Sequence, residues 1–377
     1  MRRLPDWKRA VVKVGSALIA PDGMGCKTKH LLPIARFISE SMQNGREVIL
    51  VSSGAVAAGR VVKTRPNPRR RGSIVEKQAL AAVGQSMLMQ IWSTLFDAPC
   101  AQVLLTHDDL RNRRRFVNAK NALKELLKMG VLPIVNENDP VAVEELKVGD
   151  NDNLAAHVAV ATEADLLIIL TDIDGLYDAN PHEVKDAKLI KEVVRITEAT
   201  YALAGGAVSK TGTGGMVTKI QAAEKATLQG IPTIIACGSK GGPDQLMHGV
   251  CPGTLFHSDS SPLAAKKHWL RHALETCGSV EVDAGAARAL CEQGASLLPS
   301  GAIGVRGDFH RGDAVEIMHG GQVIAKGLSQ YGAENLRRIL GRRSDEIATV
   351  LGFYYMDAIV HRGDMVCIHK VEAAAAV

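Results

Sequence analysis

The sequence predicts an α/β protein in which a mainly parallel sheet is covered by helices, followed by a small β-rich domain. The chain has 377 residues, more than one typical hydrophobic core accommodates, so two domains are expected. Residues 1–257 alternate short β-branched runs with longer helical patterns, which is typical of a parallel sheet buried on both faces. Beyond about residue 258 the apolar runs are interrupted by Gly and Asp, which indicates short strands joined by turns.

The expected strands of the first domain are continuous apolar runs. They cover residues 10–15, 47–53, 101–106, 131–137, 165–171 and 231–238. Two intervening helices have start signals: Thr28 can cap a helix that runs toward Gln43, and the sequence SIVE at 73–76 is a capping box for a helix that ends near Phe96. We therefore expect a first domain at 1–257, a linker at 258–277 and a β-rich domain at 278–377.

Composition is that of an ordinary globular protein, with 46% hydrophobic and 23% charged residues. The longest apolar runs, such as LLIIL at 166–170, are far shorter than the roughly 20 residues that a membrane helix needs. The basic N-terminus lacks the apolar segment of a signal peptide. The seven cysteines are odd in number and never spaced as CxxC, which argues against a disulfide framework and a zinc ribbon. We expect a cytoplasmic protein with no membrane partner.

Polar or Gly-rich segments follow four of the expected strands. They are KVGSA, SSGAVAAG, NENDP and TDIDGLY. Because ligands bind beyond the carboxyl ends of the strands in open parallel sheets, these segments mark the expected functional edge.

The phosphate-binding motifs of the commonest nucleotide enzymes are missing. There is no GxxxxGK[ST], no GxGxxG after a strand, and no HRD with DFG, which excludes a P-loop, a Rossmann motif and the protein-kinase fold. The remaining candidate is TGTGGMVTK at 211–219, a Gly-rich turn that runs into a helix and ends on Lys219. Free backbone N–H groups and the helix dipole favour an anion there. A flexible linker loop is the alternative.

Other features are compatible with the same anion. Lys13 lies in a strand between valines, where an unpaired charge is costly to bury, so we expect it to face the ligand. Tight turns with exposed amides are expected at Gly15, Ser16, Ser53 and Gly54.

Residues 136–153, NENDPVAVEELKVGDNDN, crowd six carboxylates and four amides into what we expect to be one short loop. An EF-hand starting at Asp150 would need Gly and Glu where the chain has Ala155 and Ala161. Zinc fits no better, because His157 is the only nearby His and no Cys is close. We interpret the stretch as a socket for a small zwitterion, with carboxylates for an ammonium and amides for a carboxylate; a solvated loop is the alternative.

Several motifs resemble one known family. VVKVGSA, VSSGAVAAGR, KQALAAVGQSMLM, LLTDIDGLY, NENDPVAVEELKVGDNDNLAA and GTGGMVTKIQAA are closely similar to the glutamate 5-kinase branch of the amino-acid kinase family. Residues 278 to about 357 resemble a PUA domain, and the whole resemblance runs from about residue 9 to 365. It implies an amino-acid kinase α/β/α sandwich with a mostly parallel sheet, plus a small β-rich PUA domain.

The resemblance also implies an activity. ATP, which carries Mg²⁺ without a dedicated metal site of the protein, would phosphorylate the γ-carboxylate of L-glutamate to L-glutamyl 5-phosphate, the first step of proline biosynthesis. Feedback inhibition by proline, a homo-oligomer (dimer or tetramer) and a hand-off to glutamate-5-semialdehyde dehydrogenase are further expectations from the resemblance.

The resemblance implies roles for individual residues. Lys13, Lys219 and Asp152 match the catalytic positions, with Asp152 as the carboxylate that holds both lysines in place. The positions that match glutamate-binding residues are Ser53, Gly54, Asp139 and Asn151. The positions that match nucleotide-contacting residues are Lys13, Gly15, Thr171, Asp172, Thr213, Gly214, Gly215, Met216, Val217, Thr218 and Lys219.

Two rival functions stay open at this point. The first is another kinase of the same fold, acting on aspartate, acetylglutamate, carbamate or uridylate. The second is RNA binding through the PUA-like region. Residues 278–377 hold 10 Lys and Arg against 12 Asp and Glu, a net charge of −2, which removes the long-range attraction to RNA. We therefore do not expect an RNA partner.

Overall fold

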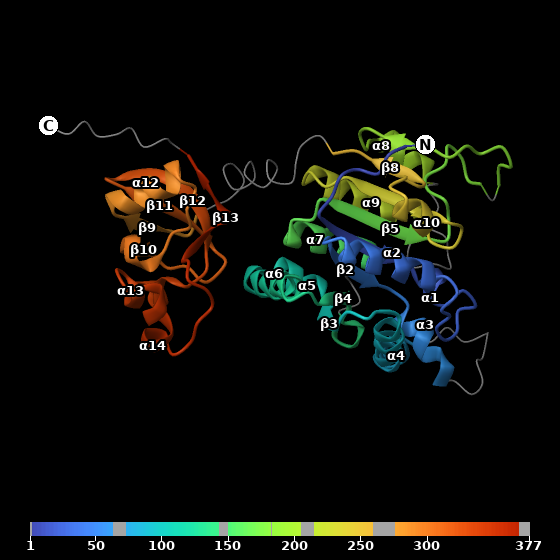
Figure 1. Cartoon of the computed structure of the whole chain (residues 1–377), viewed down its shortest axis with the longest axis horizontal. Coiled ribbons are helices and arrows are strands. Elements are labelled where there is room, and N and C mark those ends of the chain that lie inside the picture. Colours follow the sequence, from blue (N-terminus) through green and yellow to red (C-terminus); the bar gives the residue numbers. More distant parts are fainter. Residues whose placement is uncertain are drawn as a thin grey trace. The chain divides into compact units, whose positions relative to one another are not determined.

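The computed structural model describes residues 2–62, 73–142, 150–181, 183–204, 215–258 and 276–368. The chain divides into two compact units, one formed by Met1–Arg111 with Asn118–Pro262 and the other by Asn112–Val117 with Leu263–Val377. Figure 1 shows the elements of both. The predicted fold class, a mostly parallel α/β sheet with a separate small β-rich unit, is confirmed.

The described strands of the first unit form one sheet in the order β3-β4-β2-β1-β5-β7-β8-β6. Every pairing is parallel except that of β7 with β8. The strands are β1 (Arg9–Val14), β2 (Glu47–Ser52), β3 (Cys100–Leu105), β4 (Leu132–Glu137), β5 (Leu166–Thr171), β6 (Glu192–Val193), β7 (Thr233–Cys237) and β8 (Thr254–Phe256). All six predicted strands are confirmed to within two residues at each end. The short edge strands β6 and β8 were not predicted, because runs of two and three residues carry no periodic signal.

The helical elements between β1 and β8 are α1 (Ser16–Ile19), α2 (Leu31–Gln43), α3 (Ala55–Gly59), η1 (Arg60–Val62), α4 (Ile74–Leu95), α5 (His107–Arg111), α6 (Arg113–Lys128), η2 (Asp139–Val141), α7 (Asp150–Thr162), α8 (Glu198–Leu203), α9 (Met216–Leu228) and α10 (Gly242–Met247). The predicted cap of α4 is confirmed, because Ser73 accepts a hydrogen bond from the Glu76 backbone N–H at 3.2 Å. The predicted Thr28 cap is wrong. The N-cap of α2 is His30 without a side-chain cap, and Thr28 instead closes a turn with its backbone carbonyl.

Two hydrophobic cores lie on opposite faces of this sheet. One contains Ile34 of α2, Leu88 of α4 and Leu246 of α10, and the other contains Leu123 of α6, Ala155 of α7 and Ile220 of α9. In Figure 1 strand β5 accordingly lies with α2 on one side and α9 on the other. Helices on both faces explain why the strands read as continuous apolar runs rather than as alternating ones.

The second unit is built on a sheet with the described order β10-β9-β11-β12-β13. Its elements are β9 (Gly278–Val282), α12 (Ala284–Glu292), η4 (Pro299–Gly301), β10 (Ala302–Gly307), β11 (Ala314–His319), β12 (Gln322–Ser329), α13 (Ala333–Ile339), η5 (Ser344–Glu346), α14 (Ile347–Leu351) and β13 (Val360–Cys367). Val280, Leu336 and Val360 belong to a core of its own. The predicted linker at 258–277 lies almost entirely outside the described residues, so the domain boundaries stay predictions.

Within the described part of the chain, no helix combines the length and the apolar character that crossing a bilayer requires.

Candidate active site

Lys13 faces the side of the sheet that α7 and α9 cover. Ala10, Val12 and Val14 of β1 pack into the core beneath α2 and α4, whereas Val11 packs into the core beneath α7 and α9. Because side chains alternate along a strand, Lys13 lies on the same face as Val11. Its side chain is buried, with 3% of the residue exposed.

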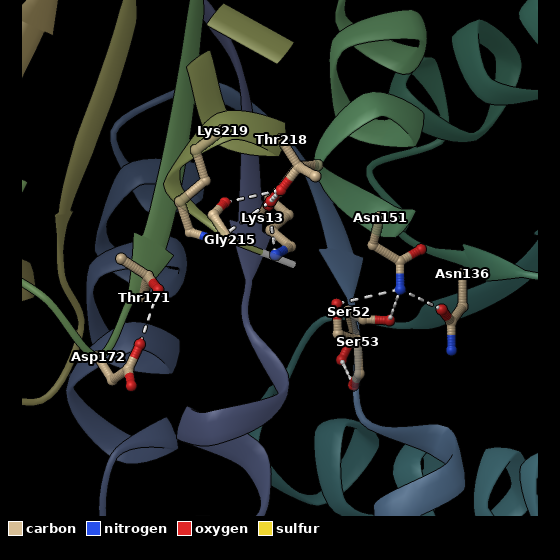
Figure 2. Close-up of polar contacts among 11 residues, drawn as sticks. Lys13, Ser52, Ser53, Asn136, Asn151, Thr171, Asp172, Gly215, Thr218 and Lys219 are labelled. Carbon is tan, nitrogen blue, oxygen red and sulfur yellow. Dashed lines mark hydrogen bonds and ion pairs between the residues drawn. The ribbon is translucent and has the colours of Figure 1, made fainter. Parts of the chain in front are cut away.

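Asp152 joins Lys13 to a second lysine. Its Oδ1 lies 2.5 Å from Lys13 Nζ, and its Oδ2 lies 3.2 Å from Lys219 Nζ. Asp152 is in the first turn of α7, Lys219 is the fourth residue of α9, and both are buried. Thr218 Oγ1 lies 3.0 Å from the same Oδ2. Figure 2 shows the two lysine side chains and Thr218 converging on one point.

The charges in this cluster determine the protonation of Asp152. Burial by itself would raise the pKa of the carboxyl, but the positive charges of Lys13 and Lys219 and their hydrogen bonds outweigh it and lower the pKa to about 2. The carboxylate is therefore ionised at neutral pH, and two ammonium groups around one carboxylate give this cluster one net positive charge.

The start of α9 lies beside this cluster. Gly215 is the extended N-cap residue, and Met216, Val217 and Thr218 form the first helical turn. The backbone N–H groups of such a turn have no partner within their own helix and favour an anion. The predicted nucleotide residues Thr213 and Gly214 lie outside the described residues.

The other predicted nucleotide residues lie at the ends of β1 and β5. Gly15 follows β1 and donates its backbone N–H to Leu170 O at 3.0 Å. A Cβ at Gly15 would lie 3.3 Å from that oxygen and 3.9 Å from Lys13 Nζ, so the glycine keeps the backbone close to the lysine. Thr171, the last residue of β5, donates its hydroxyl to Asp172 Oδ1 at 3.0 Å.

A second polar cluster contains predicted glutamate-binding residues. Asn151 Nδ2 lies 3.1 Å from Ser53 Oγ and 2.8 Å from Asn136 Oδ1 (Figure 2). Gly54, directly after Ser53, has a φ of 95° and is the N-cap of α3, and a Cβ there would lie 2.9 Å from the Ile19 side chain. Only glycine fits this turn, which holds Ser53 against Asn151.

Asp139 lies in η2 and lines a cavity of about 250 Å³ between α4 and the ends of β3 and β4.

The prediction that residues 136–153 form one short loop is wrong. Asn136 and Glu137 end β4, and α7 starts at Asp150 with Asn151 and Asp152 in its first turn. The run Asp-Asn-Asp-Asn at 150–153 can begin a helix, because Asp and Asn are favoured at helix N-termini. Residues 143–149, including Glu144 and Glu145, lie outside the described residues.

Two residues that support this second cluster were not among the predicted site residues. Gln85 of α4 accepts a hydrogen bond from Asn136 Nδ2 at 2.7 Å, and Trp92 Nε1 donates to Ser52 Oγ at 2.9 Å. Gln85 is 8% exposed, and a buried glutamine on an otherwise apolar helix face was the available signal. Its partner on β4 could not be named without the tertiary structure.

The fold and the site together define an α/β protein whose parallel sheet carries, at its carboxyl edge, a buried lysine cluster beside a helix N-terminus, an arrangement that suits an anionic ligand. The family model described as "Amino acid kinase family" matches residues 8–237, and the model described as "PUA domain" matches residues 278–351. The chain therefore belongs to the amino acid kinase family and carries a PUA domain.

Curated relatives narrow this family to one branch. The glutamate 5-kinase of Salinibacter ruber is 59% identical over 96% of this chain and 98% of its own length. That of Idiomarina loihiensis is 52% identical over 97% of this chain and 99% of its own. Among solved structures, carbamate kinase from Giardia lamblia bound to AMP-PNP is 21% identical, with a TM-score of 0.48, and covers 67% of this chain and 99% of that one. The resemblance to the glutamate 5-kinases is confirmed.

Proposed function

We propose that this protein transfers the γ-phosphoryl group of ATP to the γ-carboxylate of L-glutamate and so makes L-glutamyl 5-phosphate for proline biosynthesis. The names of the full-length relatives support this substrate pair. The observation that carries the proposal is the buried Lys13–Asp152–Lys219 cluster, which lies one residue along α7 from Asn151. A carboxylate oxygen attacks the γ-phosphorus, the bond to the β,γ-bridging oxygen breaks, and ADP leaves.

The acceptor needs no general base. A glutamate side chain has an ordinary pKa near 4.3 and is ionised at neutral pH. The obstacle is repulsion between this carboxylate and the triphosphate, which costs roughly 1 kcal/mol per charge pair at about 4 Å in water and roughly 4 kcal/mol at an effective dielectric constant near 20. Lys13, Lys219 and the first amides of α9 offset this repulsion, and Asp152 keeps both ammonium groups in position.

The remaining predicted residues divide between the two substrates. Ser53 and Asn151 bind glutamate, with Asp139 opposite its ammonium group. Gly15, Thr171, Asp172 and the segment Thr213–Lys219 bind the nucleotide. Mg²⁺ bound with ATP would supply further charge neutralisation. Both Asp152 oxygens already contact lysines, which supports a metal held by the phosphates rather than by this carboxylate.

Trapping the acyl phosphate with hydroxylamine tests the proposal. Purified protein with Mg-ATP should form a hydroxamate with L-glutamate, and much less with L-aspartate or N-acetyl-L-glutamate. Aspartate is one methylene shorter, and N-acetylglutamate lacks the ammonium that Asp139 would pair with. A preference for N-acetylglutamate would contradict the assigned site.

Three wider properties are also proposed from the family. They are feedback inhibition by proline, assembly into a dimer or tetramer, and transfer of the labile product to glutamate-5-semialdehyde dehydrogenase. Adding proline to the hydroxamate assay, and measuring the mass in solution by light scattering, test the first two directly.

A further inference from the structure

Three buried amide side chains form a hydrogen-bonded chain that begins at Asn151, the residue before Asp152 in α7. Asn136 of β4 is 1% exposed and bridges Gln85 of α4 to Asn151 of α7, each 8% exposed. Asn136 Nδ2 donates to Gln85 Oε1 at 2.7 Å, and Asn151 Nδ2 donates to Asn136 Oδ1 at 2.8 Å. We call these three residues the amide relay.

A backbone group fixes the polarity of the amide relay. The oxygen and nitrogen of an amide side chain are easily interchanged, so their assignment needs a partner whose role is certain. The backbone N–H of Glu137 can only donate, and it lies 2.8 Å from Asn136 Oδ1. The Asn136 nitrogen must therefore point toward Gln85, whose side-chain oxygen accepts the hydrogen bond. The Asn151 nitrogen must likewise point toward the Asn136 oxygen.

This polarity leaves two defined ends. Asn151 Oδ1, an acceptor, and Gln85 Nε2, a donor, are both buried and have no hydrogen-bond partner within the described residues. A buried polar atom without a partner destabilises the folded chain, so a ligand that hydrogen-bonded to both ends would bind more tightly. A donor and an acceptor together suit a zwitterion, whose carboxylate accepts and whose ammonium donates.

The surroundings of Gln85 also suit such a head group. Gln85 lines the cavity of about 250 Å³ together with Ser86, Glu137 and Asp139, and with the exposed Gln102 of β3. Two carboxylates favour an ammonium there, whereas the amide of Gln85 and the hydroxyl of Ser86 can donate to a carboxylate.

The helix that carries Gln85 is fixed closely against the other side of the site. A Cβ at the preceding residue, Gly84, would lie 1.8 Å from Ala55 O, and one at Gly59 would lie 1.9 Å from Leu80 O. The backbones of α3 and α4 therefore touch. Because α3 begins directly after Ser53 and Gly54, Gln85 is held at a fixed position relative to the proposed glutamate residues.

We propose that Gln85 is a specificity-determining residue whose Nε2 donates a hydrogen bond to the α-carboxylate of the amino-acid substrate. Asn151 Oδ1 accepts a hydrogen bond from the ammonium group of the substrate, and Asp139 contacts the same ammonium group. Asn136 is a positioning residue that sets the polarity of the relay and does not touch the substrate. This inference rests on the proposed function, since it assumes that an amino acid is the phosphoryl acceptor bound here.

The test compares L-glutamate with 4-aminobutyrate, which keeps the γ-carboxylate and the ammonium but lacks the α-carboxylate. Gln85→Glu keeps an oxygen for Asn136 and replaces the donor by a second, negatively charged oxygen. Loss of a hydrogen bond to a charged group should raise KM for glutamate about 10- to 100-fold with little change in kcat. The preference of kcat/KM for glutamate over 4-aminobutyrate should fall by a similar factor, because only glutamate loses the contact.

Gln90→Glu is the matched control. It makes the same substitution in the same helix, but Gln90 is exposed and neither lines the cavity nor belongs to the amide relay. It should retain the wild-type preference for glutamate. If it loses that preference as fully as Gln85→Glu, the effect is one of general charge and the assignment to Gln85 is overturned.

Gln85→Met, which removes the donor without adding charge, gives the same comparison should Gln85→Glu fold poorly. A merely structural role would weaken both substrates equally and leave the preference unchanged, which overturns the inference. So does a wild-type enzyme that uses 4-aminobutyrate as well as glutamate. Neither result touches the proposed function, which fails only if wild-type protein forms no hydroxamate from glutamate.

Discussion

At the residue scale, the site depends on one carboxylate between two ammonium groups. Asp152 contacts Lys13 at 2.5 Å and Lys219 at 3.2 Å, and all three residues are buried. Without Asp152 the two lysines would repel each other in a medium that screens charge poorly. Without either lysine the phosphate of the proposed nucleotide would lose a positive charge that stabilises it.

Lys219→Ala should lower kcat at least about 100-fold, because it removes a preorganised positive charge where negative charge must be stabilised. KM for glutamate should change little, since Lys219 contacts Asp152 and not the amide relay. Steady-state kinetics with the hydroxamate assay measures both. The control is Lys225→Ala in the same helix, whose ammonium contacts Asn153 Oδ1 at 2.7 Å. Near-normal turnover of Lys219→Ala would remove this lysine from the mechanism.

Asp152→Asn should destabilise the protein in a pH-dependent way. The pKa of Asp152 is lowered from 3.8 to about 2 in the folded chain, so its ionised form stabilises the fold above about pH 4. That stability, about 2 kcal/mol, is lost as the pH falls from about 4 to about 2. Urea unfolding should therefore show a gap between wild type and Asp152→Asn at pH 6 that narrows toward pH 2. A gap that is constant with pH would contradict the assigned pairing.

At the element scale, the contact between α3 and α4 positions two parts of the site. Gly59 and Gly84 let the two helix backbones touch, and Ser53 and Gln85 lie next to this contact in the chain. Glycine inside a helix normally costs stability, so its presence at the middle of the 22-residue α4 is explained by this close approach.

Gly84→Ala should lower the free energy of unfolding by about 1–3 kcal/mol, the usual cost of overpacking, despite the better helix propensity of alanine. It should also raise KM for glutamate, because α4 must shift and Gln85 shifts with it. Thermal unfolding and steady-state kinetics provide the two measurements. Gly285→Ala in α12 is the matched helical control, because its Cβ would meet only a side-chain oxygen, at 3.3 Å. Equal melting temperatures for the two variants would argue against the close contact.

At the scale of the whole molecule, each of the two units has a hydrophobic core of its own among the described residues. The clusters of the first unit contain residues from Leu4 to Phe256, whereas the main cluster of the second unit contains residues from Val280 to Met365. Every described residue of the proposed site belongs to the first unit. We therefore propose that phosphoryl transfer belongs to the first unit alone.

A chain of residues 1–258 should fold and form hydroxamate with a KM for glutamate within about threefold of the full-length value. That limit corresponds to less than 1 kcal/mol of binding free energy. Circular dichroism and the hydroxamate assay check folding and activity. The same truncation carrying Lys219→Ala serves as the inactive control. A folded truncation without activity would show that the PUA domain contributes to the site.

The fold class, the main strands and the chemistry expected at the carboxyl edge of the sheet could all be predicted from local sequence patterns. Continuous apolar runs specify buried parallel strands because both of their faces must be covered. Lys13 and Lys219 could be singled out because a charge in a buried strand and a Gly-rich helix start are unusual locally, whereas the role of Asp152 was implied by the family resemblance.

Which side chains meet could not be predicted in this way, because it depends on how distant elements pack in the folded chain. Gln85, Asn136 and Asn151 are separated by up to 66 positions in the chain, and no local pattern joins them; the 2.7 and 2.8 Å hydrogen bonds arise because α4, β4 and α7 converge. The polarity of this relay likewise depends on one backbone N–H, that of Glu137, whose direction follows from the path of β4. Local patterns record the environment of each residue, whereas the partner of a buried polar group is set by packing.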